Sequence, residues 1–403
     1  MTTTVNNEHK NIKVPNLRFK EFQGEWEKCK FGDIATGFDY GMNAAAKTYD
    51  GVNKYIRITD IDEATSTYTD KDIVSPDGVL KDNYLVNDCD ILLARTGAST
   101  GKSYLYKKSD GKLYYAGFLI RANVTTHDPY FVFSQLHTHR YWRWVSIMSA
   151  RSGQPGINSQ EYSSFPIYTT SIKEESKIAK LLSLLDDRIA TQNKIIEDLK
   201  KLKSAIIEEY YRQTEKNEVC VADLGNHFNV GNLAKDDLSE TGKPCIIYGE
   251  LFTTYGEIIS QIESHTNKTG GMILSKKGDL LFPSSTTVDA VSLIAPSVIN
   301  VDNVILGGDM FGIHISHNYN AQYLSYYFNH IAKKQLAKFA KGSTIIHLHY
   351  TDIEKAKLLL PSLEEQNRMA KCLVALDKKV SVEQNLLSSL TCQKSYLLQQ
   401  MFI

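Results

Sequence analysis

The chain contains a long internal repeat. When the sequence is shifted by 191 positions, the segment from Ile178 to Ile206 falls on the segment from Met369 to Leu397, with the same pattern of apolar residues, lysines and aspartates. A period this long is far from the few tens of residues that are typical of a solenoid. The repeat therefore predicts two large, similar modules in one chain, related by a pseudo-two-fold axis. Such a molecule is suited to a target made of two parts.

Each copy of the repeat ends in a heptad pattern, in which seam residues recur at alternating steps of 4 and 3. Polar interruptions recur at equivalent places, Gln192 with Glu383 and Lys203 with Lys394, and such residues fix register and orientation. One alternative is two amphipathic helices on separate cores. The matched interruptions instead favour two helices that pack on each other in antiparallel orientation. The predicted seam consists of Leu182, Leu185, Ile189, Gln192, Ile196, Leu199, Leu373, Leu376, Val380, Glu383, Leu387 and Leu390.

A strand-rich stretch precedes each heptad segment. Buried strands are expected at residues 55–61 and 90–94 of the first half, and at residues 245–251 and 279–283 of the second. Residues 130–148 and 321–340 are expected to be helical, and the loops at residues 152–158 and 343–349 align with each other. We therefore predict an α+β fold with two strand-rich domains and a pair of long antiparallel coiled-coil helices. The predicted parts are residues 1–170, 171–215, 216–361 and 362–403.

The composition is that of a globular protein from a reducing compartment. No run of eighteen apolar residues occurs, so no membrane span is expected, and residues 1–7 lack the apolar core of a signal peptide. The six cysteines form no C-x-x-C pair, which indicates neither a disulfide framework nor a zinc site and favours a cytoplasmic location. The net charge is zero. Any nucleic-acid binding must therefore depend on local basic clusters.

The loop from Arg95 to Ser103 follows a predicted buried strand. It departs from the phosphate-binding motif G-x-x-x-x-G-K-[ST], because Thr96 stands at the first glycine position and the following segment alternates like a strand instead of opening a helix. We therefore do not predict nucleotide hydrolysis. Residues 95–121 contain six basic residues, a single acidic residue and four tyrosines. This pattern predicts contact with a polyanion, and the alternative is a solvated hairpin with ordinary surface lysines.

Two other motifs have simpler explanations. Asp128-Pro129-Tyr130-Phe131 resembles a tetrapeptide of amino-methyltransferases, but it lacks one proline and is better explained as a helix start capped by Asp128. His347 and His349 have the spacing of two metal ligands on a strand, but no third ligand stands at convincing spacing. We therefore interpret them as loop histidines. No segment resembles a catalytic triad or a paired-carboxylate nuclease site.

Four elements of the chain, in their order and duplication, resemble the specificity subunit of a type I restriction-modification system. The elements are the module start at 14–19 with Trp26 and 31–34, the strand and loop at 90–97, the helix start at 360–366, and the long helix that ends at 397–402. This sequence departs from the pattern at two places. Thr170 stands where the second module has Pro361, and residues 283–287 differ from residues 94–97.

The resemblance implies two target-recognition domains, each of which reads one part of a split, asymmetric DNA sequence. The paired helices would space these domains and dock two methyltransferase subunits, and restriction (motor-nuclease) subunits would join that core. The chain itself would hold no active site and no cofactor. S-adenosylmethionine, Mg and ATP would belong to the partner subunits.

The expected DNA contacts lie in the basic loop and in the loops aligned by the repeat. They are Arg57, Arg95, Thr96, Lys102, Arg151, Gln154 and Asn158 in the first domain, and Ser284, Lys341, Ser343, Thr344 and His347 in the second. The competing hypothesis is a non-catalytic two-headed coiled-coil scaffold that binds protein or glycan. A steep fall in affinity with salt would distinguish DNA binding from that alternative.

Overall fold

The computed structural model describes residues 13–150 and 155–403, and the chain divides into two compact units. The first unit comprises residues 1–194 and 384–403, and the second comprises residues 195–383. Both divisions fall inside long helices, so each unit holds one strand-rich domain and a stretch of each helix. Within the described residues, no helix is long and apolar enough to cross a membrane.

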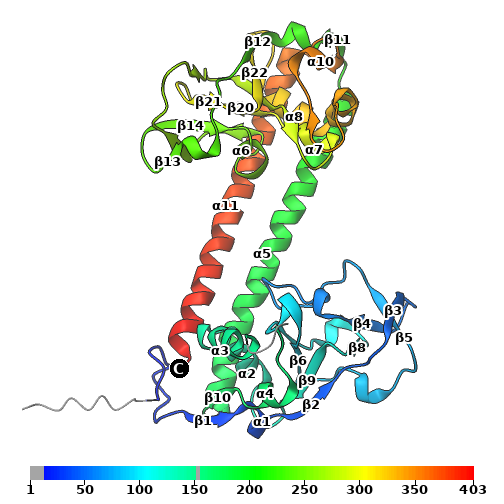
Figure 1. Cartoon of the computed structure of the whole chain (residues 1–403), viewed down its shortest axis with the longest axis vertical. Helices are drawn as coiled ribbons and strands as arrows, with labels where there is room; N and C mark the ends of the chain where they lie inside the picture. Colours follow the sequence, from blue (N-terminus) through cyan, green and yellow to red (C-terminus); the bar gives the residue numbers. More distant parts are fainter. Residues whose placement is uncertain (1–12, 151–154) are drawn as a thin grey trace, which may run out of the picture. The chain divides into compact units, whose positions relative to one another are not determined.

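A four-stranded antiparallel sheet forms the centre of the first domain (Figure 1). Its strands, in spatial order, are β2 (Thr36–Tyr40), β9 (Leu119–Asn123), β6 (Asp90–Ala94) and β7 (Ser103–Leu105). Ile91 and Leu93 belong to one apolar core, whereas Leu92 and Ala94 belong to a second core with Tyr104. Both faces of β6 are buried, which agrees with the unbroken apolar run at residues 91–94 of this strand.

The other elements of the first domain surround this sheet. The strands are β1 (Glu27–Lys30), β3 (Ala45–Thr48), β4 (Lys54–Ile56), β5 (Val74–Asp77), β8 (Leu113–Tyr115) and β10 (Pro166–Thr169). The helices are α1 (Phe31–Ile34), α2 (Pro129–Gln135), α3 (His139–Ser149) and α4 (Ser159–Ser163). The strand pairs are β1 with β10, β3 with β5, and β4 with β8, of which the last is parallel.

The second domain contains two five-stranded sheets. One has the order β12 (Gly225–Asn229), β22 (Met310–Ile315), β18 (Asp279–Pro283), β20 (Ser297–Ile299) and β15 (Ile258–Ile259). The other has the order β13 (Leu238–Ser239), β16 (Ser264–Thr266), β14 (Lys243–Ile247), β21 (Ile305–Gly307) and β17 (Ile273–Leu274). The short strands β11 (Asn217–Cys220) and β24 (Lys357–Leu360) pair, as do β19 (Ser285–Thr286) and β23 (Ile346–His347).

Six helices follow the central long helix in the chain: five short helices of the second domain and the second long helix. They are α6 (Glu250–Thr253), α7 (Ala290–Leu293), α8 (Ala321–His330), α9 (Lys333–Leu336), α10 (Tyr350–Ile353) and the C-terminal α11 (Leu363–Met401). The central long helix α5 spans Ile172–Gln213.

The internal repeat extends through the strand-rich domains. The neighbour order β2-β9-β6-β7 matches β12-β22-β18-β20, and the parallel pair of β4 and β8 matches the parallel pair of β14 and β21. Thr96 and Gly156 form an isolated antiparallel bridge, and the equivalent contact in the second domain is the pairing of Ser285 with His347. The prediction of two similar α+β modules is therefore confirmed.

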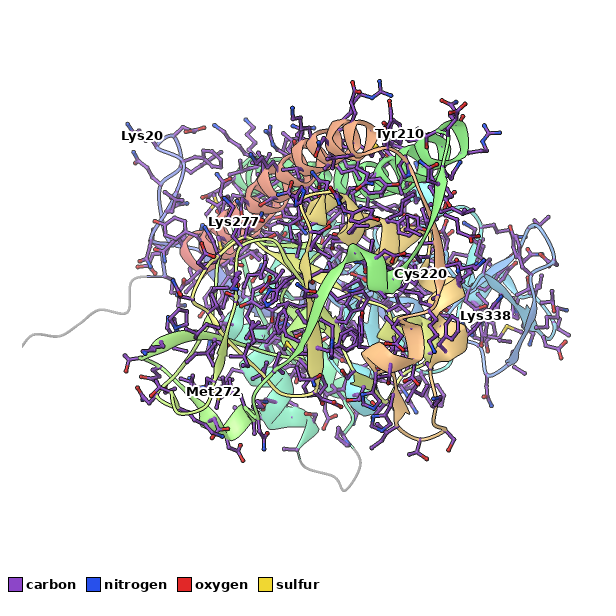
Figure 2. The ribbon with its side chains drawn as sticks, turned by 90° about the horizontal axis from the view of Figure 1, so that it is seen from above. Lys20, Tyr210, Cys220, Met272, Lys277 and Lys338 are labelled. Atoms are coloured by element: carbon purple, nitrogen blue, oxygen red, sulfur yellow. The ribbon has the colours of Figure 1, made fainter. Side chains whose placement is uncertain are left out.

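The predicted seam residues of α5 and α11 are all buried or half-buried. Gln192 is 5% exposed and Glu383 is 8% exposed, so the polar interruptions lie on the buried side of each helix. In the second unit, the Tyr210 hydroxyl of α5 donates to the Glu365 carbonyl of α11 at 3.1 Å (Figure 2). Tyr210 lies near the end of α5 and Glu365 near the start of α11. Lys203, which is earlier in α5, pairs with Asp377, which is later in α11, so the two helices run antiparallel.

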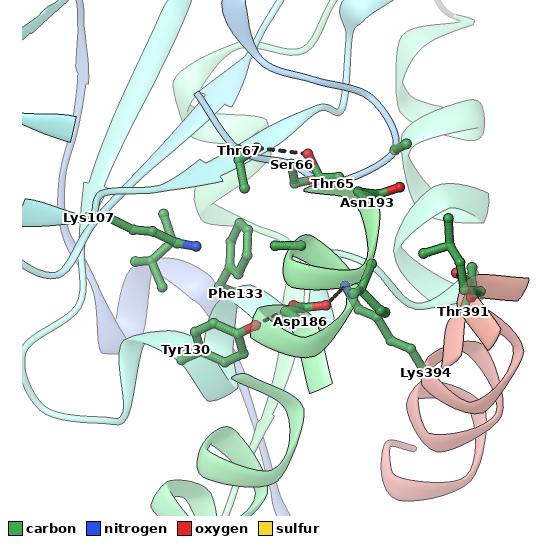
Figure 3. A pocket seen from close by; sticks show the side chains of 15 residues that line it. Thr65, Ser66, Thr67, Lys107, Tyr130, Phe133, Asp186, Asn193, Thr391 and Lys394 are labelled. Carbon is green, nitrogen blue, oxygen red and sulfur yellow. Dashed lines mark hydrogen bonds and ion pairs between the residues drawn. The ribbon is translucent and has the colours of Figure 1, made fainter. Parts of the chain in front are cut away.

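One polar cluster occurs in both units at equivalent positions of the helix pair. In the first unit, Lys394 of α11 pairs with Asp186 of α5 at 2.6 Å, and Asp186 also accepts the Tyr130 hydroxyl (Figure 3). In the second unit, Lys203 of α5 pairs with Asp377 of α11 at 2.9 Å, and Asp377 accepts a tyrosine hydroxyl from α8. Lys394 follows Lys203 by 191 positions, and Asp377 follows Asp186 by 191 positions. The internal repeat thus extends to individual ion pairs.

Four predicted elements differ from the structure, among them the strand expected at residues 245–251, which ends at Ile247 because residues 250–253 form α6. The expected strand at residues 55–61 ends at Ile56, because Arg57 forms a bidentate pair with Asp60 and residues 58–60 form a 3-10 turn. The expected helix at residues 130–148 is two helices, since Thr138 caps α3 by accepting from the Tyr141 N–H. The expected helix at residues 321–340 also breaks, after His330.

The predicted start of that first helix is confirmed. Asp128 is the N-cap of α2, and its carboxylate accepts from the backbone N–H groups of Tyr130 and Phe131 at 3.0 and 3.1 Å. Pro129 stands in the first turn, where its missing N–H costs nothing. The tetrapeptide is therefore a capping motif.

Candidate nucleic-acid interface

The loop after β6 is held in place by contacts to backbone atoms. The Tyr162 hydroxyl donates to the Ala94 carbonyl at 2.6 Å and accepts from the Gly101 N–H at 3.2 Å. The Tyr141 hydroxyl donates to the Gly101 carbonyl at 2.8 Å. Burial raises the pKa of both phenols, so both remain protonated donors. The loop therefore has a fixed path before any ligand arrives.

A second loop pairs with the first along its edge. The Ile157 N–H donates to the Arg95 carbonyl at 2.9 Å, and the Gly97 N–H donates to the Pro155 carbonyl at 3.0 Å. The next strand, β7, begins at Ser103. The absence of a helix at this place excludes the P-loop geometry, in which helix amides hold the phosphate.

Arg95 lies at the centre of this region. Its guanidinium carbon is 4.7 Å from the ring centroid of Tyr40, and within the described residues its Nε atom is buried without a hydrogen-bond partner. The Tyr40 hydroxyl in turn accepts from the Ser159 N–H at 3.2 Å, which joins β2 to α4. An arginine stacked on a ring keeps its planar donors pre-oriented, and arginine is the residue that most often reads guanine edges.

Arg95, Tyr40, Arg57 and Phe118 line a hollow of about 630 Å³, which we call the first hollow. Arg57 is committed there to Asp60 and to Asp72 at 3.1 Å, and the hydrogen bonds that its guanidinium donates to Asp60 raise its pKa. Its charge is therefore largely compensated, which makes Arg57 a weaker candidate for a phosphate contact than its sequence position indicated.

The remaining expected contacts of the first domain vary in accessibility. Lys102 is only 18% exposed and pairs with Glu63 at 3.2 Å, so it is not a free surface cation. Thr96 is half-buried and bridged to the second loop. Asn158 is exposed, but its side chain caps α4 by accepting from the Glu161 N–H at 2.9 Å. Arg151 and Gln154 lie outside the described residues.

The second domain has a hollow at the equivalent place, with a volume of about 720 Å³, which we call the second hollow. The 191-residue shift relates Tyr248 to Arg57 and Asp309 to Phe118, and both residues line the second hollow. Lys333 supplies a cation to its wall. Equivalent positions of the two hollows thus carry different side chains, Arg57 and Phe118 in the first and Tyr248 and Asp309 in the second.

The expected contact residues of the second domain differ in exposure and in whether they line this hollow. Ser284 was selected because it aligns with Arg95, but it is 3% exposed, and the structure places Ser285 in the hollow instead. Ser343 and Thr344 are exposed near the tip of the hairpin that leads into β23. Lys341 is 76% exposed and pairs with Asp352 at 2.5 Å.

His347 also lines the second hollow, and its ring stacks on that of His349 with 6.2 Å between centroids. Within residues 13–150 and 155–403, no cluster of three or more His, Cys, Asp or Glu side chains could hold a metal ion. His347 is the last residue of β23, and His349 is the N-cap of α10.

Sequence reasoning missed the aromatic walls of both hollows. Tyr40 reaches Arg95 from β2, and Phe118 approaches from the turn before β9. The repeat itself offered one signal for the second hollow, because applying the 191-residue shift to Arg57 leads directly to Tyr248. No comparable signal was available for Tyr40, since its partner is 55 residues away.

Two modules of one fold, each with its own hollow and paired loops, define a two-headed recognition protein. A sequence profile described as "Type I restriction modification DNA specificity domain" matches residues 23–201 and 214–391. The chain belongs to this family, and it carries the domain twice. It is a DNA specificity subunit and not an enzyme by itself.

Similar proteins agree with this assignment over nearly the whole chain. The MjaVIII specificity subunit of Methanocaldococcus jannaschii is 22% identical over 396 residues, covering 91% of this chain and 90% of that protein. A putative MjaX specificity subunit from the same organism is 24% identical and covers 66% of this chain and 65% of its own length.

Solved structures show the same fold. The type I restriction-modification S subunit from M. genitalium has a TM-score of 0.64 at 16% identity, covering 97% of this chain and 99% of that one. A chain from a study of complex assembly and conformational transition in the type I system has a TM-score of 0.55 at 14% identity, covering 94% and 97%.

Proposed function

We propose that the two modules read the two parts of a split, asymmetric DNA sequence, each through its own hollow and paired loops. The observation that carries this proposal is the pair of hollows at repeat-equivalent positions with different lining residues. A shared scaffold with different linings is what two different half-sites require. Arg95 is the first candidate for base contact in the first module, and Ser343, Thr344 and His347 are candidates in the second.

The helix pair is the proposed docking element for partner subunits. Two methyltransferase subunits would bind the core of the complex, and restriction subunits would join it in the cytoplasm. S-adenosylmethionine, Mg and ATP would serve those partners, which perform methyl transfer and cleavage. Long helices that bury a mainly apolar seam are suited to this role, because their outward faces stay available.

The test is to express the chain with its methyltransferase partner and to map the methylated motif. A bipartite motif with an unread spacer is expected. Arg95→Ala should relax the sequence preference at one position of one half-site, at a cost of about 1–3 kcal/mol. Lys112→Ala is the matched control, because Lys112 is an exposed cation of the same domain that does not line the first hollow.

Two results would contradict the proposal. If Arg95→Ala and the lysine control weaken binding equally at all sequences, Arg95 contacts phosphate and does not read a base. If affinity for duplex DNA is independent of salt in both proteins, phosphate neutralisation does not drive binding at all.

A further inference from the structure

A pocket of about 250 Å³ lies in the first unit, away from the first hollow. The loop around residues 64–67, helix α2, and the stretches of α5 and α11 that belong to this unit enclose it (Figure 3). Phe133, Ile189 and Leu387 give it apolar walls. The comparison with known specificity domains assigns no role to this pocket.

The pocket carries an excess of positive charge. Its charged lining residues, among those described, are Lys107, Lys394 and Asp186. Asp186 already pairs with Lys394 and accepts the Tyr130 hydroxyl. The Lys107 side chain extends toward the middle of the pocket from the opposite side (Figure 3), and within the described residues it forms no ion pair. One cation therefore remains without a carboxylate.

In the second unit, the equivalent lysine–aspartate cluster contains a further carboxylate. Lys203, the equivalent of Lys394, contacts two carboxylates, Asp377 and Glu257, each at 2.9 Å. Glu257 also contacts His330 Nε2 at 3.0 Å. Burial opposes ionisation of Glu257, but His330 and Lys203 outweigh it and lower the pKa of the carboxyl to about 2. This carboxylate is therefore ionised and fixed.

Ser66 occupies the position of Glu257 in the first unit. The 191-residue shift relates the two residues. Each contacts a histidine near the C-terminal end of a helix, since Ser66 Oγ lies 2.9 Å from His137 Nε2 just after α2, and Glu257 contacts His330, the last residue of α8. A serine is too short to reach the lysine. The pocket is thus the space that a glutamate side chain fills in the second unit.

We propose that this pocket binds a small amphiphilic carboxylate, whose charge takes the place of the missing glutamate beside Lys394 and Lys107 and whose chain packs on Phe133, Ile189 and Leu387. Charge-assisted contacts to two lysines favour an anion over a neutral ligand, and the apolar walls favour a hydrocarbon tail. A bound ligand would connect the 64–67 loop to the helix pair. This inference is independent of how the chain reads DNA.

The volume limits the ligand to a short chain. Drug-sized ligands occupy pockets of about 300–1,000 Å³, so an acid of about eight carbons is a suitable probe. We expect the purified full chain to bind octanoate saturably at pH 7, with a Kd on the order of 0.1 mM. Octan-1-ol should bind at least about tenfold more weakly, because it lacks the charge.

Two variants test the placement of the ligand. Ser66→Glu supplies the carboxylate internally and should abolish octanoate binding. Lys107→Gln should weaken binding about tenfold without affecting folding, because Lys107 is exposed, and Lys112→Gln is its control outside the pocket. In wild-type protein, burial and the nearby charge of Lys394 lower the pKa of His137 to about 4. Octanoate should raise that pKa, which NMR titration of the histidine measures.

Three results would overturn the proposal. The first is the lack of saturable octanoate binding to wild type up to about 5 mM. The second is equal affinity for octanoate and octan-1-ol, which would mean that the lysines do not recognise the charge. The third is unchanged binding by both the Ser66→Glu and Lys107→Gln proteins, which would place the ligand elsewhere.

Discussion

Glu257 should make the second unit sensitive to acid. Its side chain is 18% exposed, and its pKa is lowered to about 2 from an ordinary value near 4.5. A carboxyl whose pKa is depressed by folding stabilises the native state above the unfolded pKa, and that stability is lost as the pH falls toward the folded pKa. The shift corresponds to about 3 kcal/mol at pH 7, of which about 2 kcal/mol should be lost by pH 3.

The assay compares Glu257→Gln with wild type at pH 7 and pH 3, by hydrogen exchange of peptides from the second unit. The glutamine cannot titrate, so the stability difference between the two proteins should shrink by about 2 kcal/mol between these pH values. Glu218→Gln removes an exposed carboxylate of the same domain and serves as the control, for which we expect no such change. A stability difference that is the same at both pH values would refute the reasoning.

Three further predictions concern the scaffold. Tyr162→Phe should cost about 1 kcal/mol and weaken DNA binding, measured by denaturation and by titration with duplex, because the first loop loses its anchor. Leu373→Ala should cost about 2–5 kcal/mol in thermal or chemical unfolding, whereas Leu184→Ala, at a 52% exposed position, should change stability by less than about 0.5 kcal/mol. Matched heptads inserted after Leu199 and after Leu390 should lengthen the unread spacer of the methylated motif by about three base pairs, because a heptad adds about 10 Å of helix. Unmatched insertion of two residues should abolish activity, and an active variant with the original spacer would show that the helices set no distance.

The sequence predicted those features that depend on local or periodic signals. The seam from Leu182 to Leu390 follows from heptad spacing, and the cap at Asp128 follows from the residue type and the next proline. The module architecture follows from the repeat. These features can be predicted without knowing which distant residues are in contact.

The side-chain partners within the site could not be predicted in this way. Lys102 appears in the sequence as a free cation, yet Glu63 reaches it from a loop 39 positions earlier. Ser284 aligns with Arg95, but the turn of the backbone after β18 buries it. Periodicity identifies which residues share an element, whereas burial and ion pairing depend on the tertiary contacts between elements.

The tyrosine anchors of the first loop have an evolutionary consequence. On this loop, Tyr162 and Tyr141 contact main-chain atoms, namely the carbonyls of Ala94 and Gly101 and the Gly101 N–H. Every residue type presents a backbone carbonyl, and every type except proline presents an N–H. The side chains between the two anchored residues can therefore be exchanged while the backbone keeps its course. Recognition can thus change from one sequence to another without a loss of foldability.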